Sequence, residues 1–224
     1  MNNFSYFKKT DIVFSHLESL GKLRTFPKNH ILVEHDTIPD YCYLICKGKV
    51  MGIETLDSGE EFIYSILDNN ALFCEANLLA RRPVPVSFKV IQDSDILCID
   101  RTSLLMAMEN DQQLMTSILN SISTKFIDAM DEVRDIKNHN AIWRLCKLLT
   151  DLANRYGVAY DDKVLIHEKI SIQTLTSMMG VNRATTVRSL KLLRDLGLVE
   201  HINGYYCIRN LDSLKRHQEL LEQL

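Results

Sequence analysis

Cationic side chains recur along the segment from residue 183 to residue 194, and no acidic residue interrupts them. They are Arg183, Arg188, Lys191 and Arg194. Arginine can donate two hydrogen bonds to O6 and N7 of guanine, and arginine and lysine both neutralise phosphates, so this segment has the chemistry needed to bind duplex nucleic acid. A solvated helix face is the alternative, because runs of charge commonly have that role. The neighbouring residues distinguish the two interpretations.

Helix and turn signals surround this segment. Ser171 is a favoured N-cap for a first helix, Gly180 suits the left-handed residue that ends it, and Asn182 can cap a second helix. Further along, Asn203–Gly204 lies between two β-prone runs, which is typical of a two-residue hairpin. The combination predicts a helix-turn-helix followed by a β-hairpin wing and favours DNA recognition.

A helical wheel separates two arcs of the second helix. One arc is predicted to pack on the domain and holds Thr186, Leu190, Leu193 and Leu196. The residues on or near the opposite arc that are expected to read base edges are Arg183, Ala184, Val187 and Arg188. The residues expected to contact phosphates and set the register on DNA are Ser171, Gln173, Thr185 and Lys191.

Charge is unevenly distributed along the chain. Residues 1–136 hold 13 Lys and Arg against 20 Asp and Glu, a net charge of −7, whereas residues 137–224 hold 13 against 9, a net charge of +4. Because cationic side chains displace the counterions of phosphates, the C-terminal part is the expected DNA side. The acidic N-terminal part must have a different role.

Short candidate strands separated by turn signals fill most of the N-terminal part. Tight turns are predicted at residues 47–49 and 57–60. Residues 1–110 are therefore expected to form a sandwich or an antiparallel β-barrel. The candidate strands are residues 31–34, 41–46, 49–55, 62–67, 86–91 and 96–100.

Helical periodicity replaces the strand pattern at residues 111–137. Apolar residues recur there at spacings of three and four, as on one stripe of a long helix. Such a helix needs a partner, and the same helix of a second subunit is expected, since palindromic DNA sites favour two-fold dimers. Residues 138–224 then form the predicted DNA-binding domain. The stripe consists of Met115, Leu119, Ile122, Phe126, Ala129, Met130 and Val133.

Other classes of function have weaker support in the sequence. No apolar run approaches the roughly 18 residues of a membrane span, and the N-terminus does not read as a signal peptide, so we expect a cytoplasmic protein with no membrane partner. The histidines form no compact ligand set, so no metal, no cofactor and no enzyme activity are expected. A ligand-binding or catalytic barrel with an accessory nucleic-acid attachment domain remains the alternative.

The chain resembles the Crp/Fnr family, which includes the cyclic-AMP receptor protein. The resemblance rests on the order of strands, long helix and winged helix-turn-helix, on residues 170–193, and more weakly on the run Tyr-Leu-Ile-Cys-Lys-Gly-Lys-Val at residues 43–50. It implies an α+β fold with a jelly-roll, cyclic-nucleotide-binding-like barrel, a long dimerisation helix and a winged helix-turn-helix. It also implies a homodimeric transcription regulator with a small-molecule effector and RNA polymerase as partners. Ala184 replaces a glutamate frequent in the family, so the operator is expected to differ from the best-known half-site.

The effector region departs from the family pattern. Glu75 matches a family glutamate, but Cys74 replaces a glycine, and the phosphate-binding arginine is replaced near Val84 or Pro85, so cyclic AMP is not expected. Two alternatives are open for Arg81 and Arg82: binding of an anionic metabolite beside Glu75, or a solvated loop. The candidate effector pocket comprises Cys74, Glu75, Arg81, Arg82, Ala129 and Met130.

This chain also lacks the residues that hold redox cofactors in other branches of the family. Iron–sulfur members of the family carry several cysteines near the N-terminus, but no cysteine precedes Cys42 in this chain. Ala76 replaces the histidine of a haem-sensing branch. The six cysteines are expected to be reduced thiols that act as small apolar residues. A redox role for one of them is the alternative.

Overall fold

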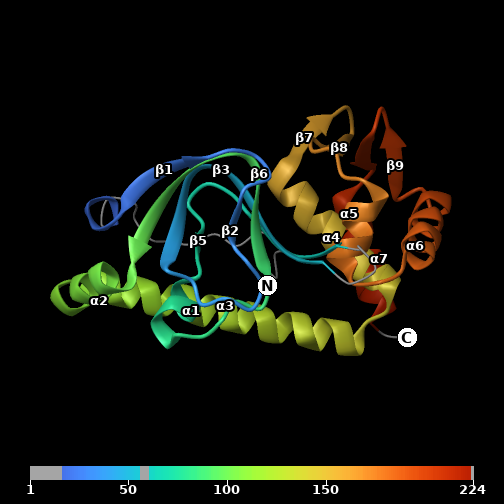
Figure 1. Ribbon diagram of the computed structural model, residues 1–224. Coiled ribbons are helices and arrows are strands. Elements are labelled where there is room, and N and C mark those ends of the chain that lie inside the picture. Colours follow the sequence, from blue (N-terminus) through green and yellow to red (C-terminus); the bar gives the residue numbers. More distant parts are fainter. Residues whose placement is uncertain (1–16, 56–60, 223–224) are drawn as a thin grey trace. The chain divides into compact units, whose positions relative to one another are not determined.

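A computed structural model describes residues 17–55 and 61–222 (Figure 1). The chain divides into two compact units, and the boundary falls between Ala129 and Met130, within the long helix α3. The turn predicted at residues 57–60 lies outside the described residues.

The N-terminal unit is built on an antiparallel sheet in the order β1-β6-β3-β4, with β2 paired to β6 and β5 paired to β3. Two long strands, β3 and β6, form most of the pairs. The sequence analysis predicted each of these long strands as two shorter strands, and it predicted no strand at β1 or β5. The strands are β1 (Lys22–Phe26), β2 (Ile31–Val33), β3 (Tyr41–Thr55), β4 (Glu61–Leu67), β5 (Leu72–Phe73) and β6 (Ser87–Asp100).

The reversal predicted at residues 47–49 is wrong, because β3 continues through it with shifts in register against β6. Gly48 has φ of 117°, a conformation that glycine adopts without a steric penalty. The Lys49 amide donates to Ser94 Oγ at 3.1 Å. The glycine therefore bends a strand that continues and does not end it.

Alternation along the long strands sends successive side chains to two separate cores. Tyr43 and Ile45 enter one core, where the Tyr43 and Phe73 rings stack at 5.1 Å between centroids. Cys42 and Leu44 enter the other core, which also contains side chains of three helices. The helices of this unit are a 3-10 turn (Glu18–Leu20), α1 (Glu75–Ala80), α2 (Arg101–Asn110) and the first part of α3 (Gln112–Asn138).

The long helix α3 has the 27-residue extent that its periodicity predicts, and α2 is a separate helix before it. Leu114, Ile118 and Ser121 are buried on one face of α3. A neighbouring face exposes apolar side chains along much of its length. The exposed members of the predicted stripe are Met115, Leu119, Phe126, Ala129, Met130 and Val133.

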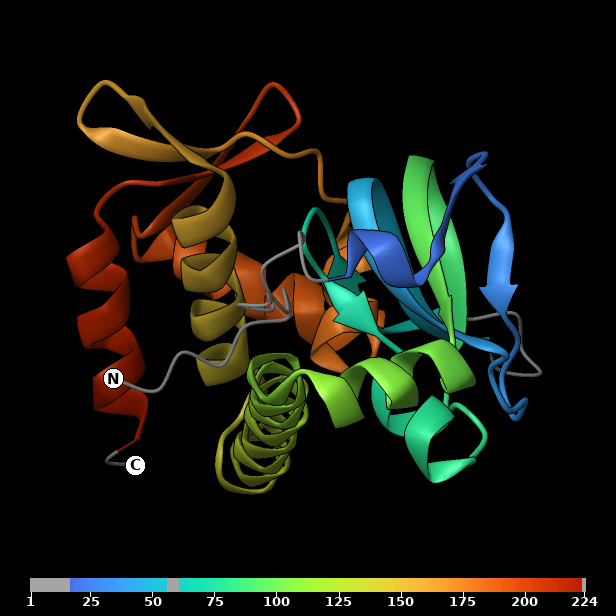
Figure 2. The ribbon, with the colours of Figure 1, turned by 90° about the vertical axis from the view of Figure 1, so that its left-hand side faces the viewer.

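The C-terminal unit combines helices with a second antiparallel sheet in the order β7-β8-β10-β9, which Figure 2 shows as a layer above α4 and α7. Asp161, with φ of 53°, lies in the tight turn that joins β7 to β8. The elements are α4 (Ala141–Tyr156), β7 (Gly157–Tyr160), β8 (Lys163–Ile166), α5 (Ile172–Met179), α6 (Arg183–Asp195), β9 (Val199–Ile202), β10 (Tyr205–Ile208) and α7 (Leu211–Leu221).

A cluster of charges connects the end of α3 to α4 within this unit. Asp135 is 5% exposed and forms an ion pair with Lys147 of α4. One turn further along α4, Oδ2 of Asp151 is buried and has no hydrogen-bond partner among the described residues. Burial raises the pKa of Asp151 to about 7; the charge of Lys147 opposes this shift and that of Asp135 adds to it.

Asp151→Asn is expected to flatten the pH dependence of stability. The folded pKa lies above the unfolded value of about 3.9, so the folded chain binds more protons between these values and the free energy of unfolding falls as pH rises from about 4 to 7. Thermal unfolding at pH 5 and pH 8 measures this, with the exposed Asp162→Asn as control. Equal pH dependence in wild type and Asp151→Asn would contradict the assignment.

Candidate nucleic-acid interface

Local hydrogen bonds define both helices of the helix-turn-helix, as the sequence predicted. The Ser171 hydroxyl accepts from the Thr174 amide at 2.9 Å at the start of α5, and Gly180 ends that helix with φ of 60°. The Asn182 side chain accepts from the Thr185 amide at 2.8 Å and starts α6. Satisfied helix ends give α5 and α6 defined limits, and hence a defined turn between them.

The inner face of α6 packs into the C-terminal unit. Leu190 and Leu193 are almost fully buried, and the buried hydroxyl of Thr176 in α5 donates to Thr186 Oγ1 at 3.0 Å. The guanidinium of Arg144 in α4 donates to the Met179 carbonyl at the end of α5 at 2.9 Å. The Thr176 hydrogen bond thus joins α6 directly to α5, and Arg144 of α4 holds the end of α5 in place.

Leu196 is an exception to the predicted packing arc. It is 50% exposed, because α6 ends at Asp195 and Leu196 is the C-cap at the edge of the arc. Gly197, with φ of 68°, then takes the chain toward β9. The prediction for Leu196 was wrong because a wheel assumes that the helix continues.

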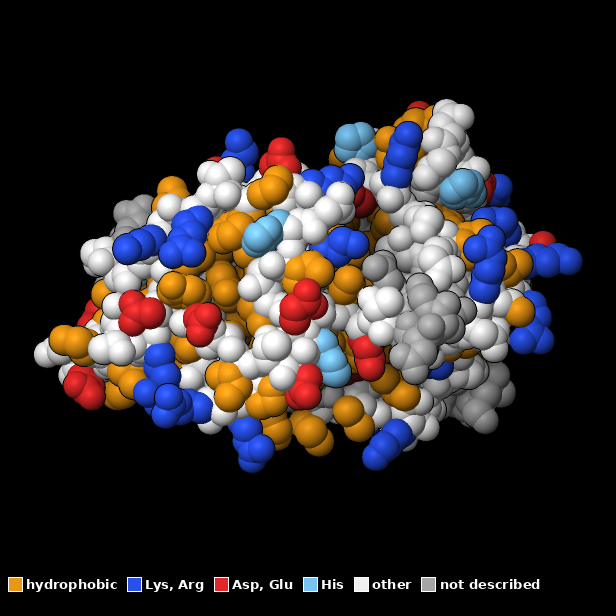
Figure 3. All heavy atoms as spheres, viewed as in Figure 1, with side chains coloured by type: hydrophobic (Ala, Val, Ile, Leu, Met, Phe, Trp, Pro, Cys, Tyr) orange, Lys and Arg blue, Asp and Glu red, His pale blue; other side chains and the backbone are white. Residues whose placement is uncertain are grey.

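The outer face of α6 has the composition of a surface for base edges. Val187 is 43% exposed, although it is apolar. Lys and Arg side chains gather over α6 in Figure 3. All the residues predicted to read bases, together with Lys191, are exposed on this helix: Arg183, Ala184, Val187, Arg188 and Lys191.

The other residues predicted to contact phosphates have different surroundings. Ser171 and Gln173 are exposed at the start of α5, but the Ser171 hydroxyl is already used as the N-cap. Thr185 is half-buried, and its hydroxyl accepts a hydrogen bond from Nη2 of Arg188 at 3.3 Å. The wheel missed this contact, although the i to i+3 spacing of the two residues was a signal for it.

The wing follows α6 as predicted, with β9 and β10 joined at Asn203 and Gly204, whose φ values are 52° and 89°. Glu200 of β9 accepts from Lys163 Nζ at 3.0 Å and from Nε of Arg209. These two hydrogen bonds lower the pKa of Glu200. The carboxylate thereby joins β8, β9 and the end of β10 into one support for the wing.

In the N-terminal unit, Glu75 has a partner that sequence reasoning missed. Its carboxylate is 2% exposed and accepts a hydrogen bond from Ser121 Oγ at 2.9 Å, and it forms an ion pair with Lys125. Lys125 Nζ also donates to the Leu72 carbonyl at 2.7 Å. Ser121 and Lys125 lie four apart on the buried face of α3, and this spacing was the only signal in the sequence.

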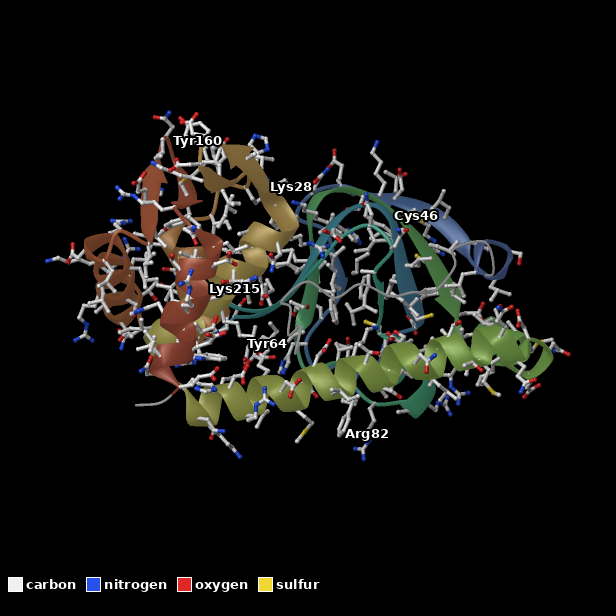
Figure 4. The ribbon with its side chains drawn as sticks, turned by 180° about the vertical axis from the view of Figure 1, so that it is seen from behind. Lys28, Cys46, Tyr64, Arg82, Tyr160 and Lys215 are labelled. Atoms are coloured by element: carbon white, nitrogen blue, oxygen red, sulfur yellow. The ribbon has the colours of Figure 1, made fainter. Side chains whose placement is uncertain are left out.

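The remaining effector candidates differ from one another in their exposure to solvent. Arg81 and Arg82 are exposed, and Figure 4 shows the Arg82 side chain extending away from the ribbon. Ala129 and Met130 are exposed on α3, whereas Cys74 is buried in a left-handed conformation with φ of 63°. Arg81 is the C-cap of α1, so both arginines lie at the end of the helix that begins at Glu75.

The cysteines have the environment of small apolar residues. Five of the six are buried, and Cys46 is half-buried. Burial raises the pKa of Cys42 and that of Cys146 to about 12, so both remain protonated thiols at neutral pH. In residues 17–55 and 61–222, no three His, Cys, Asp or Glu side chains are grouped as metal ligands. Nor does any helix within these ranges have the length and apolar character to cross a membrane.

Comparisons with known proteins cover both units. Residues 23–111 match the model of the cyclic nucleotide-binding domain, and residues 144–217 match the Crp-like helix-turn-helix domain. The chain is 24% identical to the anaerobic regulatory protein of Bacillus subtilis (strain 168), over 84% of this chain and 79% of that protein.

Two solved structures have the same fold at low sequence identity. One is the regulator CLP of Xanthomonas campestris, with a TM-score of 0.76, 15% identity, and coverage of 88% of this chain and 98% of that one. The other is a transcriptional regulator of the CRP/FNR family from Thermus thermophilus, with a TM-score of 0.73, 15% identity and the same coverage.

Lys125→Met is expected to destabilise the protein by about 3–5 kcal/mol, because it leaves the Glu75 carboxylate buried without its counterion. Urea unfolding measures the loss. The double variant Glu75→Gln with Lys125→Met removes both charges and should recover a large part of it. Losses that simply add in the double variant would show that the two side chains do not stabilise each other.

Proposed function

Because the chain belongs to the Crp/Fnr family of DNA-binding transcription regulators, which are not enzymes, we propose that it acts as a homodimer on a palindromic operator under the control of a small-molecule effector. In this proposal residues 1–110 form the sensor domain, residues 111–137 the dimerisation helix and residues 138–224 the DNA-binding domain. Its site of action is the cytoplasm, and RNA polymerase is a further partner.

The main observation in support of this proposal is the exposed face of α6. Arg183 and Arg188 are the base readers in it, because each guanidinium lies at an exposed position on a well-anchored helix and has the donors that guanine O6 and N7 require. Ala184 and Val187 offer only carbon to the groove and suit thymine methyl groups. Lys191, Ser171 and Gln173 are assigned to the phosphates on either side.

The exposed apolar stripe of α3 supports the homodimer. Leu119, Phe126 and Val133 lie seven residues apart on this face and are 54%, 65% and 44% exposed. A seven-residue repeat of apolar side chains is the pattern that pairs two helices along a common seam. A two-fold dimer carries two copies of α6, which matches the two half-sites of a palindromic operator, about 34 Å apart.

An anionic metabolite is the class of effector that we propose for the N-terminal unit. Arg81 and Arg82 follow α1 directly, and α1 begins at Glu75, whose partner Lys125 belongs to α3. A ligand bound near the end of α1 would thus act on an element that is bonded to the long helix. Cyclic AMP stays outside this proposal, because the arginine and glycine of the family's phosphate cradle are replaced.

Arg188→Ala is expected to weaken binding to the specific site by about 1–3 kcal/mol and to relax one base position per half-site. The measurement is a gel shift with the upstream region of the protein's own gene, with a salt titration, followed by selection of preferred sites from random duplexes. Arg216→Ala, which removes an exposed arginine of α7, is the matched control and should leave the selected sequence unchanged.

Phe126→Asp adds a test of the dimer to the same experiment. It should yield a monomer by light scattering and lose the palindromic preference, because a charge in the apolar seam opposes pairing. An Arg188→Ala variant with unchanged base preference would remove this residue from the readout. The absence of any sequence-specific retention by the wild-type chain would favour an accessory attachment module and contradict the regulatory proposal.

An effector is expected to raise the temperature of unfolding in a screen of organic acids, since a ligand that binds the folded state stabilises it. Arg81→Ala should abolish the shift for the acid found, whereas Lys28→Ala, another exposed cation of the same unit, should preserve it. A shift that Arg81→Ala leaves intact would move the ligand away from this loop.

A further inference from the structure

The two threonines at the start of α6 have different roles in the described structure. The hydroxyl of Thr186 points inward and is fully buried against Thr176. The hydroxyl of Thr185 lies at the edge of the exposed face and accepts from Nη2 of Arg188 at 3.3 Å. One threonine therefore anchors the helix, and its neighbour contacts a side chain of the outer face.

Thr185 is itself held in place. Its amide donates to the Asn182 side chain at 2.8 Å, and its side chain is half-buried. Threonine is branched at Cβ, which restricts χ1 on a helix to few rotamers. The hydroxyl is thus a fixed acceptor one turn before Arg188, and it limits the directions that this long side chain can take.

We propose that Thr185 is a positioning residue that orients the Arg188 guanidinium for guanine before DNA binds. The inference rests on the proposed function, because it presumes that Arg188 reads a base. Arginine has many rotamers in solution, and ordering them during binding reduces affinity. A guanidinium that is already oriented loses less freedom, and it also meets an incorrect base in a less favourable geometry.

The competing role for Thr185 is a contact with a DNA phosphate. The two roles differ in whether the contribution of the hydroxyl depends on the base sequence and on Arg188. A hydroxyl that binds a phosphate contributes about equally on every sequence, because phosphates carry no base identity. A hydroxyl that orients Arg188 contributes on sequences with the correct base and has no effect once Arg188 is removed. The dependence on Arg188 therefore separates the two roles.

The test uses full-length protein and a fluorescein-labelled duplex selected by the wild-type chain from random sequences, with single-base variants of that duplex. Thr185→Val removes the hydroxyl at nearly constant shape, and Thr185→Ser retains it. Thr185→Val should lose about 2- to 10-fold in preference for the correct base at the Arg188 position. Thr185→Ser should stay close to wild type, and the effect of Thr185→Val should vanish in the Arg188→Ala background.

Three outcomes overturn the proposal. Equal losses on all duplexes that persist with Arg188→Ala would assign Thr185 to a phosphate. An unchanged base preference in Thr185→Val would show that the hydroxyl has no influence on readout. A loss in Thr185→Ser equal to that in Thr185→Val would indicate a packing effect. If the wild-type chain selects no sequence at all, the proposed function itself fails, which is a distinct result.

Discussion

The orientation of the exposed arginines of α6 depends on the burial of the opposite side of that helix. Thr186, Leu190 and Leu193 are almost inaccessible to solvent, so the opposite side, with Arg183 and Arg188, has to face outward. The constraint is geometric, since residues three and four apart share one face of a helix. Capping and the contacts of α4 and α5 turn this tendency into a fixed orientation, without which the cations would be an undirected patch of charge.

In the N-terminal unit, a buried charge fixes the position of α1 on the long helix α3. The Glu75 carboxylate lies among apolar residues and is compensated by Lys125 and Ser121 of α3, so the start of α1 is tied to the long helix by groups that cannot separate without cost. The same helix exposes Phe126 and its apolar neighbours on another side. One helix therefore contacts the β domain and also presents the surface that we assign to a second subunit.

Predictions from local signals were confirmed where the physics is local. A cap at Ser171 or Asn182 and a turn at Asn203 require only neighbouring residues, and all are present. The predictions that failed required knowing whether a strand or a helix continues beyond the residue in question. Gly48 is a turn signal, but it lies inside a strand that pairs with β6 on both sides of it, and Leu196 continues the apolar arc of α6 although the helix ends at Asp195.

Local patterns in the sequence were sufficient to predict the class of the C-terminal unit, the starts of α5 and α6 and the face of α3 that carries apolar residues. Helical period and capping are encoded within a few positions. Only the folded chain shows that Glu75 is paired with a lysine 50 residues away, that Asp151 is buried and that two pairs of short predicted strands are single long strands. Those outcomes depend on contacts between segments distant in the chain. No local pattern specifies which distant segment removes a carboxylate from water or supplies its counterion.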